Sequence, residues 1–288
     1  MRIATVRTPD GTRAARVDDD QLTLLEASDV GRLVAESSDW SGRANQARGP
    51  RISLEEADLA PLTPKPEKII CVGLNYSDHA AEAQLEPTPH PTLFAKYWRS
   101  LLGPNDDLVL PDASDSVDWE LELGVVIGSP IRNATADQAL AAVAGYTIVN
   151  DISMRDWQMH TSQFLAGKTF EGSTPVGPFL VTPDEVDHAG ALSMQLTLDG
   201  EVMQQSSTDQ LIFTVPEIIS YVSTVITLVP GDLIATGTPS GVGAVREPPL
   251  FLAPDNVIEC SIEGLGSQST RCVAPPKEKG ARSLAAVR

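Results

Sequence analysis

Three acidic residues alternate with apolar residues in the segment 116–127. Because successive side chains of a strand point to opposite faces, Asp118, Glu120 and Glu122 would share one face, about 6.6 Å apart. At an effective dielectric constant of about 20, each adjacent pair of carboxylates repels by roughly 2.5 kcal/mol. A divalent cation would compensate this repulsion, and carboxylate oxygens suit Mg²⁺, Mn²⁺ or Ca²⁺. The alternative is an amphipathic strand with one acidic, solvated face.

Asp151 is a candidate third ligand, because it ends the apolar segment 146–150 and a carboxylate at a strand end can line a cleft. On its own, Asp151 could instead cap a turn or a helix.

His79 and Glu82 would lie one turn apart if residues 75–82 form a helix, and a neighbouring carboxylate orients an imidazole and raises its basicity. This pair is either a general base or an incidental pair on a surface helix.

Several further side chains could bind an anion. Lys168 follows an expected helix, where it would meet an anion or simply be exposed. Arg155 and Gln158 lie three residues apart on an expected helical face and could offer hydrogen-bond donors near Asp151. Thr238 belongs to a glycine-rich loop that follows a strand, so its hydroxyl and nearby backbone N–H groups could also bind an anion. The glycine spacing of this loop differs from that of a P-loop or a dinucleotide-binding motif.

The scaffold that must position these residues is predicted to be rich in strands. The expected strands cover residues 2–6, 14–17, 68–73, 93–96, 108–110, 117–127, 144–151, 194–198, 202–205, 257–262 and 269–273. Fewer helices are expected, at residues 30–36, 136–144, 155–165 and 216–228. Because the strands do not alternate regularly with helices, we expect an α+β, predominantly β fold.

A proline-rich segment, residues 61–66, suggests a boundary between two parts of the chain. We therefore predict a small N-terminal α/β domain over residues 1–62 and a catalytic domain over residues 63–276. The polar residues 277–288 are expected to form a loose C-terminal tail.

The composition restricts the partners of the protein. The 288 residues include 39 acidic and 21 basic side chains, a formal net charge of −18, which disfavours nucleic acid and anionic membrane surfaces. A small anionic substrate would then need a metal or a few local cations. The three cysteines match no zinc pattern, and neither a signal peptide nor a membrane-length apolar run is visible. We expect a cytoplasmic protein.

Six motifs, in order, resemble those of the fumarylacetoacetate hydrolase family, on the branch of acylpyruvate hydrolases, oxaloacetate decarboxylases and hydroxymuconate isomerases. They lie within residues 68–267 and read VGLNYSDH (72–79), DWELEL (118–123), NDISMRDWQ (150–158), GKTF (167–170), PVGP (175–178) and PGDLIATGTPSGVG (230–243). The resemblance implies the family's mixed β-sandwich roll behind a small N-terminal domain, assembled as a homodimer.

The resemblance also implies roles for individual residues. Mg²⁺ or Mn²⁺, for which Ca²⁺ could substitute, would be held by Glu120, Glu122 and Asp151, with Asp118 outside this set. His79 and Glu82 would be the acid–base pair on a segment that closes over the substrate. The pyruvate part of the substrate, or its developing charge, would be contacted by Arg155, Gln158, Lys168 and Thr238.

The resulting hypothesis is a metal-dependent hydrolase that cleaves a C–C bond in a 3-acylpyruvate-type 2,4-diketo acid through a metal-stabilised pyruvate enolate, in aromatic catabolism. Lys168 and the metal would stabilise the enolate. The same enolate arises in decarboxylation of oxaloacetate or isomerisation of a 2-hydroxymuconate-type acid, so these reactions are the alternative. A second alternative is a protein that binds a metal and a 2-oxo acid without catalysis.

Overall fold

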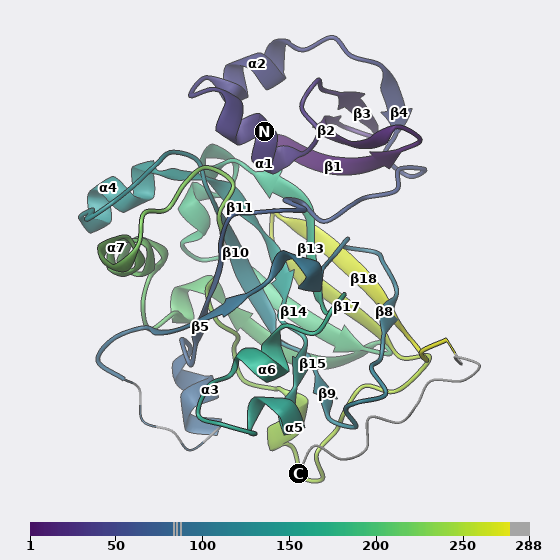
Figure 1. Ribbon diagram of the computed structural model, residues 1–288, viewed down its shortest axis with the longest axis vertical. Helices are drawn as coiled ribbons and strands as arrows, with labels where there is room; N and C mark the ends of the chain where they lie inside the picture. The colour runs from purple at the N-terminus through teal and green to yellow at the C-terminus, as the bar shows by residue number, and fades with distance from the viewer. Residues whose placement is uncertain (83, 85, 87, 277–288) are drawn as a thin grey trace.

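The computed structural model describes residues 1–82, 84, 86 and 88–276 (Figure 1). The expected C-terminal tail, residues 277–288, lies outside the described residues. The helices are α1 (Val30–Glu36), α2 (Trp40–Gln46), α3 (Ser77–Glu82), α4 (Ala136–Ala141), α5 (Arg155–Gln158), α6 (Leu165–Lys168) and α7 (Val215–Val225). The strands are β1 (Arg2–Thr8), β2 (Gly11–Asp18), β3 (Gln21–Leu24), β4 (Arg51–Ser53), β5 (Ile69–Gly73), β6 (Thr92–Lys96), β7 (Leu101–Leu102), β8 (Leu108–Val109), β9 (Val117–Asp118), β10 (Leu121–Ile127), β11 (Val143–Asn150), β12 (Ser153–Met154), β13 (Thr174–Val181), β14 (Ser193–Leu198), β15 (Glu201–Ser207), β16 (Leu233–Ala235), β17 (Val257–Ile262) and β18 (Gly266–Val273).

These strands form two large sheets and one short pair. The first sheet has the order β4-β3-β2-β1-β13-β11-β10-β16-β5-β6, with β7 also beside β13. The second has the order β15-β14-β17-β18-β8, and β12 pairs separately with β9. Both large sheets are mixed, because β5 runs parallel to β16 and β8 runs parallel to β18. The predicted α+β, predominantly β fold is confirmed.

The N-terminal strands continue the first sheet. β1 pairs antiparallel with β13, with Arg2 opposite Val181 and Ile3 opposite Leu180. The hydrogen-bonded sheet thus crosses the boundary predicted at residue 62. In Figure 1 the N-terminal elements lie at the top, whereas α3, α5 and α6 lie toward the bottom of the molecule.

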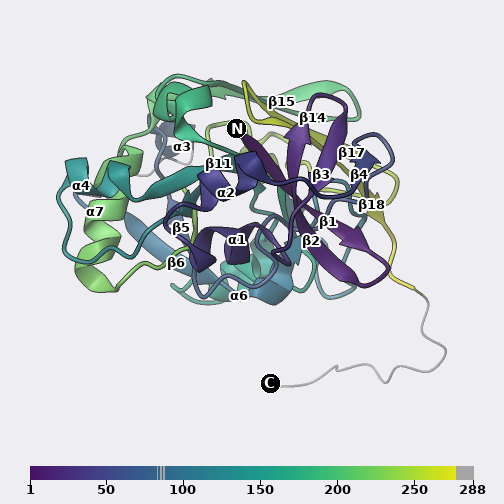
Figure 2. The ribbon, with the colours of Figure 1, turned by 90° about the horizontal axis from the view of Figure 1, so that it is seen from above.

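The main core lies between the two large sheets. A single cluster of buried side chains includes Trp119, Leu121 and Ile148 near β10 and β11, and Leu196 and Ile258 from the second sheet. Burial of such side chains contributes roughly 1.5–3 kcal/mol each. Helix α7 packs beside α4, as Figure 2 also shows. Its buried apolar side chains include Ile218, Ile219 and Val222.

Several predicted elements were wrong in their limits. Helix α7 ends at Val225 rather than 228, since Leu228 forms a β-bridge with Ile131. The expected strand 117–127 is interrupted at residues 119–120, between β9 and β10. The expected helix 155–165 is two short helices, because Thr161 accepts a hydrogen bond from the backbone N–H of Gln163 and so competes with helical pairing. Helix α4 ends at Ala141 rather than 144, since the chain from Val143 pairs with β10. Within the described residues, no helix is long and apolar enough to cross a bilayer.

Candidate active site

The interruption between β9 and β10 is stabilised by side chains. The backbone N–H groups of residues 119, 120 and 121 donate to the side-chain oxygens of Asp118 (2.8 Å), Asn150 (3.1 Å) and Gln204 (2.9 Å). The chain can therefore leave the regular strand without leaving these N–H groups unpaired in the interior.

Three carboxylates meet where β10 begins and β11 ends. Glu120, Glu122 and Asp151 are buried, and each offers an oxygen within 4.8 Å of the others. The register of β10 and β11 places Leu121 opposite Asn150, and the backbone N–H of Asp151 donates to the Glu120 carbonyl at 2.8 Å. The structure thus brings together the three ligands predicted from sequence.

Two buried lysines contact this acid triad, Glu120, Glu122 and Asp151. Lys168 Nζ lies 2.6 Å from Glu120 Oε2 and 3.0 Å from Asp151 Oδ2, and Lys96 Nζ lies 2.5 Å from Asp151 Oδ1. Sequence reasoning missed Lys96. Its position at the end of an apolar strand, the criterion that singled out Asp151, could have identified it.

The three carboxylates of the triad differ in how well nearby cations compensate their negative charge. Burial favours a neutral Glu120, but the cations Lys168 and Arg155 outweigh burial and lower its pKa to about 2. Glu122 accepts only the Gly237 N–H, at 2.8 Å, among the hydrogen bonds of the described residues. Burial, followed by repulsion from Asp151 and Glu120, raises the pKa of Glu122 well above its usual value. An additional cation near Glu122 would relieve this repulsion.

The triad fits a hard divalent cation. Its donors are all carboxylate oxygens, the type that Mg²⁺ and Mn²⁺ prefer. Within the described part of the chain, it is the one group of at least three His, Cys, Asp or Glu side chains close enough to share an ion. Glu120, Glu122 and Asp151 could therefore hold a metal.

His79 and Glu82 lie on α3 and contact each other. Their Nδ1 and Oε2 atoms are 3.4 Å apart. The backbone N–H of Gly241 donates to both oxygens of Glu82, at 3.0 and 3.1 Å. The predicted pair is thus formed, and Glu82 is fixed from the glycine-rich loop as well as from its own helix.

Arg155, the first residue of α5, connects several acceptors. Its Nε donates to Asp118 at 2.8 Å, and its Nη1 donates to Glu120 at 2.6 Å and to Gln158 at 3.0 Å. Its Nη2 is buried and has no hydrogen-bond partner among the described residues. Burial alone would lower the pKa of Arg155, but Glu120 and Asp118 raise it, so the guanidinium remains charged.

Asp118 lies outside the triad, as the resemblance implied, but it holds Arg155. Its carboxylate also accepts the backbone N–H groups of Gly243, at 2.7 Å, and Ala244, at 3.0 Å. These contacts fix the glycine-rich loop against the arginine. The alternating acidic pattern identified Asp118, but assigned it no such role.

Thr238 is held by a residue that sequence reasoning missed. Gln204 Nε2 donates to Thr238 Oγ1 at 2.8 Å and to the Pro239 carbonyl at 2.9 Å. Nothing in the sequence of β15, the strand that contains Gln204, distinguishes this residue from its neighbours. Gly237, which precedes Thr238, has a φ of +104°, and a Cβ there would lie 2.7 Å from Asn75 Cβ, so the turn requires glycine.

One cavity of about 400 Å³ collects most of these groups. Its polar lining consists of His79, Glu120, Glu122, Arg155, Gln158, Lys168 and Thr238. The remaining wall is apolar or glycine and comprises Val72, Gly73, Leu74, Phe94, Met159, Phe164, Val242, Ala244 and Val245. Cationic, anionic and acid–base groups therefore share a single cavity.

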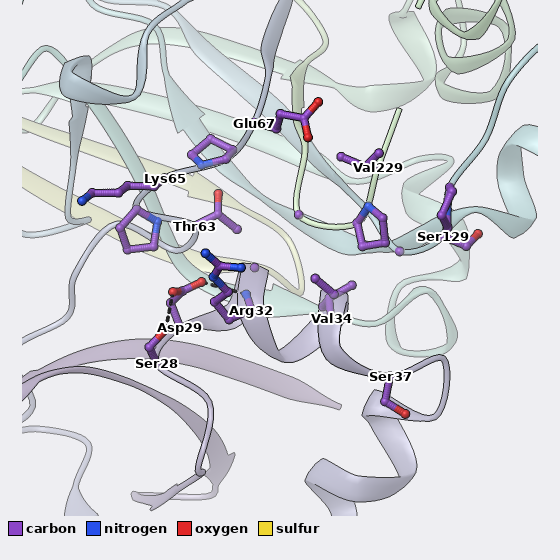
Figure 3. Close-up of a pocket in the computed structure, with 18 of the residues that line it drawn as sticks. Ser28, Asp29, Arg32, Val34, Ser37, Thr63, Lys65, Glu67, Ser129 and Val229 are labelled. Carbon is purple, nitrogen blue, oxygen red and sulfur yellow. Dashed lines mark hydrogen bonds between the residues drawn. The ribbon is translucent and has the colours of Figure 1, made fainter. Parts of the chain in front are cut away.

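A larger cavity, of about 800 Å³, lies beside α1 near the N-terminal elements (Figure 3). Its charged residues include Arg32, Lys65 and Glu67, which are exposed to solvent. Asp29 is occupied in capping α1, since it accepts the backbone N–H of Arg32 at 2.9 Å and the Ser28 hydroxyl at 2.8 Å. The acid triad and the His79–Glu82 pair line the smaller cavity or adjoin it, so we assign the candidate active site there.

Comparison with known proteins identifies the family. The family model for the fumarylacetoacetate (FAA) hydrolase C-terminal region matches residues 68–273. The mitochondrial oxaloacetate tautomerase FAHD2A of Bos taurus is 47% identical over 210 residues, which cover 72% of this chain and 67% of the relative.

Solved structures agree over nearly the whole chain. A fumarylacetoacetate hydrolase from Exiguobacterium antarcticum is 31% identical, with a TM-score of 0.85, and covers 96% of this chain and 100% of its own. A maleylpyruvate hydrolase from Sphingobium sp. SYK-6, in complex with manganese(II) and pyruvate, is 28% identical, with a TM-score of 0.81 and the same coverage. The resemblance read from the six motifs is confirmed: this chain belongs to the fumarylacetoacetate hydrolase family of enzymes.

Proposed function

We propose that this protein uses a divalent metal to interconvert the keto and enol forms of a small anionic 2-oxo acid. The observation that carries the proposal is the position of His79, which is paired with Glu82 and lines the same cavity as two carboxylates of the triad. An acid–base group beside a hard-metal site suits proton transfer next to a carbonyl. The relative named as an oxaloacetate tautomerase supports this choice of reaction.

Glu120, Glu122 and Asp151 would hold the metal, with Mg²⁺ or Mn²⁺ favoured by the carboxylate donors. The metal would supply Lewis acidity, polarising the 2-keto oxygen, and a fixed position for the 2-oxo acid. The Nη2 of Arg155, which has no hydrogen-bond partner in the part of the chain that the structure describes, and the ammonium of Lys168 would then contact the substrate anion.

His79 would carry the proton. It would remove a proton from C3, and the electron pair left behind would delocalise onto the C2 oxygen. Return of the proton to that oxygen gives the enol, and return to C3 gives the keto form. Glu82 would keep the imidazole oriented and stabilise its protonated state, while the Gly241 N–H keeps Glu82 in place.

Hydrolysis of a 2,4-dioxo acid is the second candidate, and the size of the cavity favours it. About 400 Å³ lies within the range that holds drug-sized ligands, so the cavity has room for an acyl group beyond C4. Here His79 would activate water for attack on C4. The C3–C4 bond would break, its electrons would pass to C3 and the C2 oxygen, and protonation would give pyruvate and a carboxylic acid.

Substitution of His79 tests both candidates. We expect His79→Asn to lower kcat at least 100-fold for keto–enol interconversion of oxaloacetate, followed by the ultraviolet absorbance of the enol with Mn²⁺ present. Calorimetry should show unchanged Mn²⁺ affinity, because His79 is not a ligand. His188→Asn is the matched control: His188 is exposed, lies outside the cavity and has a φ of 55°, which asparagine tolerates.

Three outcomes would contradict the proposal. Wild-type activity in His79→Asn would exclude the acid–base role. Absence of turnover by the wild-type protein, despite Mn²⁺ binding and binding of a 2-oxo acid, would favour the non-catalytic alternative. Pyruvate release from a 2,4-dioxo acid without keto–enol interconversion would favour hydrolysis over tautomerisation.

A further inference from the structure

We infer that the substrate carries an uncharged, apolar group beyond C4. This inference rests on the proposed function, because it concerns the far end of the same cavity. In a 2-oxo acid whose first carboxylate and keto oxygen lie at the polar groups, the tail of the molecule must lie against the remaining wall. The nature of that wall therefore selects the tail.

The remaining wall is built by apolar side chains from four separate segments. Leu74 follows β5, Phe94 lies in β6, Phe164 precedes α6, and Val242 and Val245 belong to the glycine-rich loop and the turn after it. Phe94 and Phe164 pack edge to face, with ring centroids 5.9 Å apart. Because different elements contribute the same kind of side chain, the apolar character belongs to the whole surface rather than to one residue.

Leu74 also adopts an unusual backbone conformation. Its φ is 56°, in the left-handed region that a leucine rarely occupies. The following residue, Asn75, fixes this turn through hydrogen bonds to the carbonyls of Phe213, at 3.0 Å, and Thr236, at 2.8 Å. The structure thus holds an apolar side chain in the wall at a conformational cost.

The segments that build the wall bring few cations. The sequence contains no Lys or Arg in residues 69–95, 156–167 or 229–245. Among the described residues, the cations that line the cavity are Arg155 and Lys168, and both contact carboxylates; Lys168 Nζ also lies 5.2 Å from the centre of the Phe94 ring. A second substrate carboxylate at the far end would therefore lose water without gaining a charged partner from these segments.

Among the described residues, Lys96 contacts Asp151, and three other groups in or beside these segments that could supply positive charge are also engaged elsewhere. One of them, His160, packs against Trp157 with ring centroids 4.9 Å apart. Arg246 donates to the carbonyls of Met203, at 3.0 Å, and Gly241, at 3.1 Å, and lies over the Trp119 ring. His90 stacks on Tyr221, with ring centroids 5.7 Å apart. Neither Arg246 nor His90 is among the residues that line the cavity.

A matched pair of 2,4-dioxo acids tests the inference. Butyrylpyruvate and succinylpyruvate differ in their terminal group, a methyl in one and a carboxylate in the other. With Mn²⁺ present, we expect kcat/KM for butyrylpyruvate to be about 100-fold higher, measured by loss of enol absorbance and, separately, by release of pyruvate. Oxaloacetate, measured in parallel, has no tail beyond C4 and reports on the proposed chemistry alone.

The outcomes separate the two hypotheses. Equal kcat/KM values, a preference for succinylpyruvate, or turnover of oxaloacetate alone would overturn the apolar tail and leave the proposed function standing. Failure of all three compounds to react would overturn the proposed function, and the inference with it. A strong preference for butyrylpyruvate supports both.

A change of one wall residue gives an independent test. Met159 lines the cavity but is 76% exposed, so a cation introduced there need not be buried. We expect Met159→Arg to raise kcat/KM for succinylpyruvate at least 10-fold. Met159→Gln, which has similar length and no charge, should produce no such gain. If the ratio of kcat/KM for butyrylpyruvate to kcat/KM for succinylpyruvate is the same in Met159→Arg as in the wild type, the lack of a cation is not the reason that the terminal carboxylate is disfavoured.

Discussion

Arg155 is the residue through which the acid triad and the glycine-rich loop are connected. It donates to Glu120 of the triad and to Asp118, and Asp118 in turn accepts two N–H groups of the loop. A guanidinium held by two carboxylates loses little further conformational freedom when it binds an anion. In the proposed function, Asp118 would therefore act on the substrate through Arg155 rather than by touching it.

Asp118→Asn should consequently affect substrate binding more than catalysis. Loss of one charged acceptor loosens Arg155, so we expect KM for the 2-oxo acid to rise at least 10-fold while kcat changes less. Affinity for Mn²⁺, measured by calorimetry, should be unchanged. Asp112→Asn, at an exposed position, is the control. Equal losses in kcat and Mn²⁺ affinity would instead indicate general damage to the site.

Glu122→Gln is the cleanest test of the metal site. Unlike Glu120 and Asp151, Glu122 is contacted by no lysine within hydrogen-bond distance among the described residues, so its removal leaves no ammonium unpaired. We expect Mn²⁺ affinity to fall at least 100-fold with little change in Tm. Glu120→Gln should weaken Mn²⁺ binding and also lower Tm, because Lys168 and Arg155 each lose a carboxylate. Unaltered Mn²⁺ affinity in both variants would show that the ligands are assigned wrongly.

At the scale of elements, the glycine-rich loop is tied to α3. Ser240 Oγ donates to Asp78 at 2.8 Å, and the Gly241 N–H donates to Glu82. The acid–base pair therefore depends on the position of a loop more than 150 residues away, since Gly241 and Glu82 are 159 positions apart. The same loop also contacts the triad, through the Gly237 N–H and Glu122, so a displacement confined to the residues around Gly241 should alter His79 more than the triad.

Gly241→Ala should produce that displacement. A Cβ at residue 241 would lie 2.0 Å from the Met203 carbonyl oxygen, so the loop must move. We expect kcat to fall at least 10-fold with Mn²⁺ affinity retained. Gly200→Ala is the matched control, because Gly200 also has a positive φ, +82°, but has open space around it. That variant should lose about 1 kcal/mol of stability, because a Cβ is disfavoured at positive φ, and should keep its activity. Equal kcat in Gly241→Ala and Gly200→Ala would show that the position of the loop does not affect the His79–Glu82 pair.

The sequence predicted the parts of the site that local pattern determines. Alternation along residues 118–122 and the end of an apolar strand at Asp151 gave four candidate acidic ligands, and helical spacing gave His79 with Glu82 as a candidate pair. The family resemblance then separated Asp118 from the triad. The interruption of the strand could not be predicted, because it depends on Asn150 and Gln204, which lie 30 and 83 positions from their backbone partners. The strand end could have identified Lys96 as a candidate, but its contact with Asp151, 55 positions away, could not be predicted from local pattern.

At the scale of the whole molecule, the acidic chain relies on local ion pairs in its N-terminal part. A hydrogen bond from Arg16 lowers the pKa of Asp18 to about 2, with a smaller contribution from Thr23. Because the folded pKa lies below the usual 3.8, Asp18 stabilises the fold above about pH 4 and loses this contribution as pH falls toward 2. Arg16 also donates to the carbonyls of Ala44 and Asn45, at 2.7 and 2.8 Å, at the end of α2.

Asp18→Asn should therefore destabilise the protein in a pH-dependent way. At pH 7 we expect a loss of about 1 kcal/mol, after allowance for partial solvent exposure of the carboxylate. The difference in Tm from the wild type should shrink as pH falls from 4 toward 2. Asp19→Asn, at an exposed neighbouring residue, is the control for melting curves across this range. If the difference in Tm between Asp18→Asn and the wild type stays constant with pH, the lowered pKa of Asp18 is not the source of this stability.

Assembly remains a prediction. The expected homodimer can be tested by light scattering on the full chain, as a function of protein concentration. A monomer at micromolar concentration would contradict it. The expected cytoplasmic location likewise remains a prediction.

The pairing of β1 with β13 has a consequence for any attempt to isolate the segment that carries the chemistry. Two further hydrogen bonds add to this contact. The Thr182 N–H donates to the Met1 carbonyl at 3.0 Å, and the Leu62 N–H donates to the Val176 carbonyl at 3.3 Å. A fragment starting after residue 62 would expose a bare sheet edge in the middle of the molecule, with backbone donors and acceptors open to any passing strand. The N-terminal strands thus cover an edge that would otherwise pair with other copies of the chain. We expect the shortened chain to aggregate before its activity can be assayed.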